Sequence, residues 1–291
     1  MEIRIEVPAS FNFKRTVLSH GWCELKPFEF DRASFMLKRV VDLGESDPVT
    51  VEISQLDGVV AIKSPVRLAR TRAELVSQFV RHMLRLDDDM DEFYRQVALD
   101  PAFQWIAAEG AGRLLRAPTV FEDLVKMVCT TNCSWALTEV MVTQLVHNLG
   151  RKTGDGRRSF PTPEAMARMP ESFYRRVVRA GYRAPYLRDL ARKVASGELD
   201  VEGWLTTQKA GPDLKREIKA VKGVGDYTAE NMLKLLGRYH GLALDSWVRG
   251  KYSELHARGR RVPDKKIERH YRSFGDWSGL VLWCDVTRDW L

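Results

Sequence analysis

The fold of this chain is decided by residues 213–249, which read DLKREIKAVKGVGDYTAENMLKLLGRYHGLALDSWVR. Apolar residues recur at helical spacing on both sides of Lys222-Gly-Val-Gly-Asp226, a segment too short and too rich in glycine to join either helix. Its two glycines permit backbone conformations with positive φ, and Asp226 is the expected N-cap of the second helix. The stretch therefore predicts a helix, a glycine hairpin and a second helix.

Such a hairpin exposes backbone N–H groups at the start of its second helix, where a phosphate binds favourably. Lys222 adds a positive charge beside Gly223 and Gly225. Glycines needed only for a turn between two packed helices explain the same residues, so the hairpin by itself leaves both interpretations open.

An isolated acidic residue lies beyond the second helix. Leu242-Ala-Leu leads into Asp245, which opens another predicted helix and suits the N-cap position of that helix. The whole pattern, Gly-Val-Gly-x-x-Thr-Ala with an Asp sixteen residues after Ala229, resembles the helix-hairpin-helix (HhH-GPD) DNA glycosylase superfamily. The resemblance implies that the hairpin grips DNA and that Asp245 is the catalytic carboxylate.

Two further segments extend the resemblance to the branch of 3-methyladenine DNA glycosylase II and 8-oxoguanine DNA glycosylase. Residues 112–132 look like the start of the helical domain in these enzymes, and residues 181–186 contain a similar Gly-Tyr-Arg-Ala segment. The branch implies a mainly α fold with an N-terminal α+β domain. We expect an antiparallel-sheet domain over residues 1–105 and an all-helical HhH-GPD glycosylase body over residues 106–291, with the hairpin at 213–237.

The residue patterns at both ends of the chain agree with this architecture. Residues 11–64 are rich in β-forming residues and turn signals. The predicted elements are the strands 35–43, 49–53 and 59–62, a turn at Asp57-Gly58, and helices within 72–84 and 277–290.

Charge and its placement favour a polyanionic partner. The 291 residues carry a formal net charge of +7, and the sequence pI is about 9.2. Residues 151–193 hold twelve Lys and Arg against four Asp and Glu, and residues 249–272 hold nine against three. Basic residues coating solvated helices would give the same counts. Together with the resemblance, the charge predicts double-stranded DNA containing a damaged base as the partner.

The four cysteines, Cys23, Cys129, Cys133 and Cys284, form neither a CxxC pair nor a disulfide framework. No signal peptide or membrane-spanning apolar run is apparent, so we expect a monomeric protein of the reducing cytoplasm, associated with the nucleoid. Some relatives hold an iron–sulfur cluster on four closely spaced C-terminal cysteines, and Cys284 is alone there. We therefore expect no iron–sulfur cluster, no metal and no cofactor, apart from a monovalent cation at the hairpin.

The resemblance also assigns DNA contacts outside the hairpin. Enzymes that act on a base in a duplex extrude it and fill the gap. Asn132 lies where relatives place a gap-filling or opposite-base-reading residue, and Tyr182 is a second candidate because its ring can stack on a base. Arg183 is expected to reach a phosphate or the opposite base, and Arg249 completes the set. A turn Asn, a packed Tyr and solvated arginines are the structural alternatives.

Two positions determine the predicted mechanism. Asp245 near the sugar would stabilise an oxocarbenium-like centre and orient water, whereas Asp285 and Asp289 are alternatives without a motif. Bifunctional relatives carry a Schiff-base lysine two residues after the second glycine, and this chain has Tyr227 there. The sequence therefore predicts a monofunctional glycosylase that uses water as the nucleophile.

Alkylated purines such as 3-methyladenine are the predicted substrates. Electron-rich rings bind a cationic purine, and Trp22, Trp135, Tyr227 and Trp247 are candidates for the pocket, although each could equally be a core residue. Leu137 stands where 8-oxoguanine enzymes have an arginine that reads the opposite cytosine. Two alternatives stay open: a glycosylase for oxidised or deaminated bases such as 8-oxoguanine, and a damaged-DNA-binding relative without catalysis.

Overall fold

The N-terminal domain is built on one antiparallel sheet. The computed structural model describes residues 1–44, 47–56 and 58–290. Its five strands have the order β1-β5-β4-β3-β2. They span Glu2–Glu6 (β1), Phe28–Asp31 (β2), Met36–Val41 (β3), Val49–Leu56 (β4) and Val59–Lys63 (β5). The expected strands are confirmed as β3, β4 and β5, whereas the sequence analysis did not find β1 or β2.

Strand β4 lies at the centre of the sheet. Its alternating pattern places Val51 and Ile53 on one face, where both are fully buried. Leu56 of β4 pairs with Val59 of β5, as a tight hairpin requires. The predicted turn itself includes Asp57, which lies outside the described residues.

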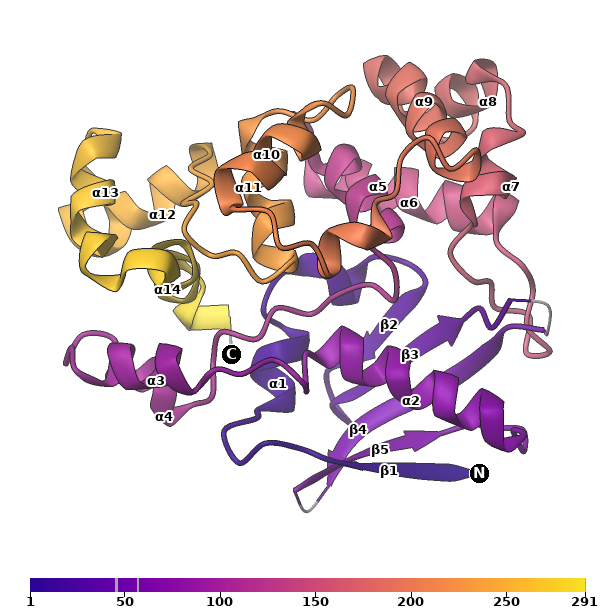
Figure 1. Cartoon of the computed structure of the whole chain (residues 1–291), viewed down its shortest axis with the longest axis horizontal. Coiled ribbons are helices and arrows are strands. Elements are labelled where there is room, and N and C mark those ends of the chain that lie inside the picture. The colour runs from indigo at the N-terminus through magenta and orange to yellow at the C-terminus, as the bar shows by residue number, and fades with distance from the viewer. Residues whose placement is uncertain (45–46, 57, 291) are drawn as a thin grey trace.

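Helices interrupt and cover this sheet domain, so residues 11–64 are less uniformly β than expected. The elements are α1 (Phe13–Val17), the 3-10 turn η1 (Gly21–Glu24), α2 (Arg70–Leu84), α3 (Asp91–Ala98) and α4 (Gln104–Ala108). Asn12 explains the start of α1, because its side chain accepts a hydrogen bond from the N–H of Arg15 at 3.1 Å. In Figure 1, α2 lies across the sheet and the later helices form the other half of the molecule.

The second half is helical, as expected. It comprises α5 (Val120–Thr130), α6 (Trp135–Leu149), α7 (Pro163–Ala167), α8 (Glu171–Arg176), η2 (Gly181–Arg183), α9 (Ala184–Ala195), η3 (Glu202–Leu205), α10 (Gly211–Lys219), α11 (Asp226–Leu235), α12 (Ser246–Ala257), α13 (Asp264–Tyr271), η4 (Arg272–Trp277), α14 (Ser278–Val286) and η5 (Arg288–Trp290). An antiparallel-sheet domain followed by a helical body confirms the predicted fold class.

The predicted hairpin is formed by α10 and α11 with one correction to its cap. Gly225 is the N-cap of α11, and no side chain caps that helix. Asp226 is the first helical residue, and its carboxylate pairs with Lys219 at 2.9 Å and Lys215 at 3.2 Å. A carboxylate in the first turn still stabilises the positive end of the helix.

Buried ion pairs join the two halves. Arg39 of β3 donates to both carboxylate oxygens of Glu122 of α5, at 2.9 and 2.6 Å, and Lys126 lies 2.7 Å from the same carboxylate. Removing one partner of such a set would leave a buried charge unpaired.

The division between domains at residues 105 and 106 stays a prediction, because packing continues across it. In the described residues, no helix is both long and apolar enough to cross a membrane.

Candidate active site and DNA-binding surface

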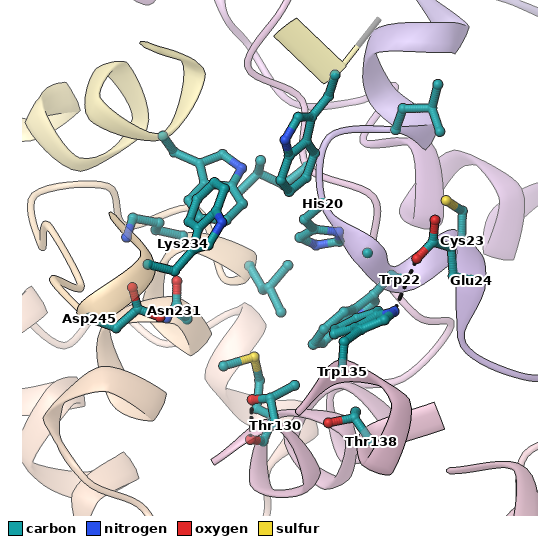
Figure 2. A pocket seen from close by; sticks show the side chains of 18 of the residues that line it. His20, Trp22, Cys23, Glu24, Thr130, Trp135, Thr138, Asn231, Lys234 and Asp245 are labelled. Carbon is teal, nitrogen blue, oxygen red and sulfur yellow. Dashed lines mark hydrogen bonds between the residues drawn. The ribbon is translucent and has the colours of Figure 1, made fainter. Parts of the chain in front are cut away.

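A cavity of about 660 Å³ lies where η1 of the sheet domain faces α11 of the helical body. Asp245 and the four aromatic residues proposed from sequence, Trp22, Trp135, Tyr227 and Trp247, all line it. Figure 2 shows Asp245 on one side of this cavity and Trp22 and Trp135 on the other. The fold therefore brings together side chains that are more than 200 positions apart in the chain.

Asp245 serves as the N-cap of α12, because its Oδ1 accepts a hydrogen bond from the N–H of Val248 at 2.7 Å. Within the described part of the chain this is the one hydrogen bond to its carboxylate, so Oδ2 remains available to a ligand. Asp285 is instead buried in the C-terminal helices, where its Oδ2 lies 2.6 Å from His256 Nε2. Of the three acids considered, only Asp245 lines the cavity.

One face of α11 supplies four cavity residues, Tyr227, Asn231, Lys234 and Leu235, at the spacing of successive helical turns. Burial, with the charge of Asp245, raises the pKa of Tyr227 to about 12, so its phenol stays protonated. The side-chain amide of Asn231 donates to the carbonyl of Tyr227 at 3.1 Å.

Lys234 is the main cavity residue that the sequence analysis missed. It is only 2% exposed, and its Nζ has no hydrogen-bond partner among the described residues. Burial lowers the pKa of Lys234 to about 8, although the carboxylates of Glu230 and Asp245 oppose this shift. Its spacing of seven from Tyr227 was the available signal, because that spacing places both residues on one helix face.

On the side of the cavity opposite α11, acidic side chains accept hydrogen bonds from two indole rings and fix their orientation. The indole N–H of Trp22 donates to Asp123 Oδ1 at 2.6 Å, and that of Trp135 donates to Glu24 Oε2 at 3.0 Å. Burial raises the pKa of Asp123 to about 7. A Cβ atom at Gly21 would lie 2.4 Å from the Trp135 ring, so a glycine at this position lets the ring close against η1. The result is a wall of two oriented tryptophans.

The C-terminal segment completes the cavity with aromatic rings. Trp247, Trp283 and Trp290 line it, and their ring centroids are separated pairwise by 5.6–5.9 Å. The indole N–H of Trp283 donates to the carbonyl of Ser19 at 2.8 Å, which ties the last helix to the sheet domain. A helix within residues 277–290 was predicted, but sequence patterns did not place Trp283 or Trp290 in the site.

The hairpin glycines have different structural requirements. Gly223 has a φ of +87°, and a Cβ atom there would lie 2.5 Å from the Tyr186 ring. Gly225 has a φ of −95° and would place a Cβ in open space. Lys222 is exposed, with its Nζ 4.0 Å from Asp189. The turn therefore demands glycine at 223, whereas glycine at 225 leaves backbone N–H groups accessible.

The segment after α5 presents the two residues proposed for insertion into DNA. Asn132 has a φ of +46°, a conformation that Asn tolerates better than most residues, and its amide lies 3.3 Å from the hydroxyl of Tyr182. Tyr182 is 48% exposed. The two side chains therefore stand next to each other on the surface.

The two arginines proposed as DNA contacts, Arg183 and Arg249, both have partners within the protein. Arg183 is only 3% exposed, and its guanidinium donates to Thr131 at both the side-chain oxygen, at 3.2 Å, and the carbonyl. These bonds hold the Thr131 backbone next to Asn132, and a contact between Arg183 and DNA stays a prediction. Arg249 forms a bidentate pair with Asp264, at 2.8 and 2.9 Å, on a partly exposed surface.

The cysteines are free thiols, and Cys133 lines the cavity. Across the described ranges, no group of three or more His, Cys, Asp and Glu side chains is arranged to hold a metal ion.

A family model of the HhH-GPD superfamily of base excision DNA repair proteins matches residues 125–275, which is more than half of the chain. The chain therefore belongs to this superfamily, and the expected class, a base excision repair DNA glycosylase, is confirmed. DNA as the partner follows from this class.

Individual relatives divide between two substrate types. A probable N-glycosylase/DNA lyase of Methanothermobacter thermautotrophicus is 23% identical over 275 residues, which cover 85% of each chain. The structure of a 3-methyladenine DNA glycosylase from Archaeoglobus fulgidus matches 99% of this chain and 98% of its own, with a TM-score of 0.78 and 21% identity. The apo form of the Clostridium acetobutylicum 8-oxoguanine glycosylase/lyase matches 98% and 95%, with a TM-score of 0.76 and 20% identity. These likenesses establish the fold and leave the substrate open.

Proposed function

We propose that this protein is a monofunctional DNA glycosylase that releases alkylated purines, such as 3-methyladenine, by hydrolysis of the N-glycosidic bond. The observation that carries the proposal is the position of Asp245 in a cavity walled by indole rings, with Tyr227 at the position of the Schiff-base lysine. An N-alkylated purine is cationic and is attracted to the faces of such rings.

In the proposed reaction, the tryptophans of the cavity bind the base and Asp245 acts on the sugar. The extruded purine lies among Trp22, Trp135 and Trp247, while the Asp245 carboxylate faces the sugar. As the glycosidic bond breaks, positive charge develops on the sugar, and Asp245 stabilises it and orients the attacking water. The products are a free base and an abasic site.

The hairpin and the Asn132 segment are proposed to hold the duplex. Backbone N–H groups near Gly225 and the charge of Lys222 bind phosphates on one side of the lesion. Asn132 and Tyr182 fill the gap that the extruded base leaves. We place the protein in the cytoplasm with the nucleoid, where four unpaired cysteines remain reduced.

A second candidate function is that of a glycosylase/lyase for oxidised bases. The position of Lys234 in the cavity favours it. Its buried amine lines the cavity that also holds Asp245, and a desolvated lysine can act as a nucleophile. An amine at this position would supply the imine chemistry that Tyr227 cannot.

One experiment separates the candidates. The purified protein is incubated with a methylated duplex and, separately, with an 8-oxoguanine duplex, while released bases and borohydride-trapped adducts are monitored. Release of 3-methyladenine without trapping supports the proposal. Strand scission with a trapped adduct on 8-oxoguanine contradicts it, and loss of that adduct in Lys234→Met would identify the amine.

A further inference from the structure

We infer that His20 is the side chain that hydrogen-bonds the polar edge of the extruded purine. The inference rests on the proposed function, because it takes the cavity to be the base-binding site. It names a base-reading residue in the sheet domain, remote in sequence from the hairpin.

His20 lies in the middle of the cavity, between its two sides. It lines the cavity immediately before η1, and Figure 2 shows its ring between the side that holds Asp245 and the side that holds Trp135. The ring is tilted by 41° against that of Trp22, with 4.8 Å between centroids. A base that enters the space between these walls meets the imidazole.

The hydrogen-bonding groups of His20 are unused. Both ring nitrogens are buried and have no hydrogen-bond partner within the described chain. Buried polar groups are normally paired, so two unpaired nitrogens on one ring at a cavity point to a partner supplied by a ligand. An uncharged imidazole offers one donor and one acceptor that point in different directions, so one of its nitrogens can bond a single donor or acceptor on a purine edge.

The surroundings keep the ring uncharged. Burial lowers the pKa of His20 to about 3, and the charges of Lys126 and Arg85 act in the same direction. No positive charge from His20 therefore opposes a cationic purine, and its acceptor nitrogen can receive the N–H of such a base. The ligand class that fits is a purine made cationic by N-alkylation.

The first test measures binding without catalysis. Free 3-methyladenine is titrated against the wild-type protein, His20→Phe and His20→Asn, and the fluorescence of the cavity tryptophans is recorded. We expect His20→Phe, which retains an aromatic ring and loses both nitrogens, to weaken binding at least about tenfold. His20→Asn, which retains a donor and an acceptor, should recover part of that loss. Wild-type affinity in His20→Phe, or no binding by the wild type, overturns the inference.

A matched control excludes a purely structural role. A duplex with a stable abasic-site analogue presents no base to the cavity, so its affinity should be the same in all three proteins. An equal loss of affinity for this duplex and for 3-methyladenine would contradict the inference. In the wild-type protein, the NMR signal of the His20 ring should not titrate between pH 5 and 8 and should shift when 3-methyladenine binds.

These outcomes are separate from those of the proposed function. A protein that binds 3-methyladenine through His20 and releases no alkylated base from DNA contradicts the function and keeps the inference. A protein that releases alkylated bases and binds free 3-methyladenine equally well with Phe at position 20 contradicts the inference alone.

Discussion

Lys234 illustrates how a single residue can lower stability where the site needs a charge. A buried ammonium without a hydrogen-bond partner is costly, and here it lies in the cavity that holds Asp245. Such residues are retained where they contribute to function. The positive charge of Lys234 supports the negative charge that the proposed mechanism requires of Asp245.

Lys234→Met should therefore make the protein more stable and less active. The folded-state pKa of Lys234, about 8, is below its ordinary value of 10.5. The cost of burying the charge is then fully present below pH 8 and disappears as the pH rises from 8 to 10.5. We expect the free energy of unfolding in urea to increase by about 1–3 kcal/mol at pH 7 and the gain to shrink by pH 10. A variant less stable than the wild type at pH 7 would contradict this.

The pKa of Asp123, which orients Trp22, is raised, whereas the pKa of Lys234 is lowered. For Asp123, burial raises the pKa from 3.8 to about 7, so the folded state holds a proton that the unfolded state has released. Its contribution to stability is full below pH 3.8 and is lost as the pH rises to 7. The melting temperature of the wild type, compared with that of Asp123→Asn, should therefore decline between pH 5 and pH 8. A constant difference between the two proteins over this range would refute the assignment.

At the scale of elements, the hairpin separates a structural glycine from an accessible one. Gly223 needs its left-handed backbone and has no room beside Tyr186, whereas Gly225 faces open space. Two substitutions in the same turn should therefore have different consequences.

Gly225→Val should fold normally and bind DNA more weakly, irrespective of sequence, because its side chain covers the backbone N–H groups. Gly223→Ala should lose about 1 kcal/mol or more of stability. Thermal unfolding and fluorescence anisotropy with a duplex at moderate salt would distinguish the two effects. Unchanged affinity in Gly225→Val would remove the hairpin from the DNA-binding surface.

Several elements could be predicted because their signals are local. Alternation identified β4, and an apolar run after the Asp57-Gly58 turn signal identified β5. Helical spacing around Lys222-Gly-Val-Gly-Asp226 identified α10 and α11. The cap at Asp226 was misplaced by one residue, because Gly225 can provide the extended conformation of an N-cap without a side-chain bond. Strand β1 was missed although Ile3 and Ile5 alternate with charged residues, which is the pattern of a strand with one buried face.

At the scale of the whole molecule, the cavity depends on contacts that sequence patterns do not record. The Trp22 and Asp123 bond spans 101 positions, and the Trp283 and Ser19 bond spans 264. The spacing of Lys234 fits a solvated helix face as well as a cavity, and its burial depends on how α11 packs in the folded protein. Arg183 was expected to reach DNA, and its bonds to Thr131 across 52 positions could not be read from the sequence. Asp245 could be predicted because the family pattern carries it.

The role of Asp245 in base release can be measured as single-turnover release of alkylated bases from a methylated duplex. Asn caps a helix about as well as Asp, so Asp245→Asn should keep the start of α12, the melting temperature and the DNA affinity. We predict that this variant releases 3-methyladenine at least about 100-fold more slowly than the wild type. Release at the wild-type rate would show that Asp245 is not the catalytic carboxylate.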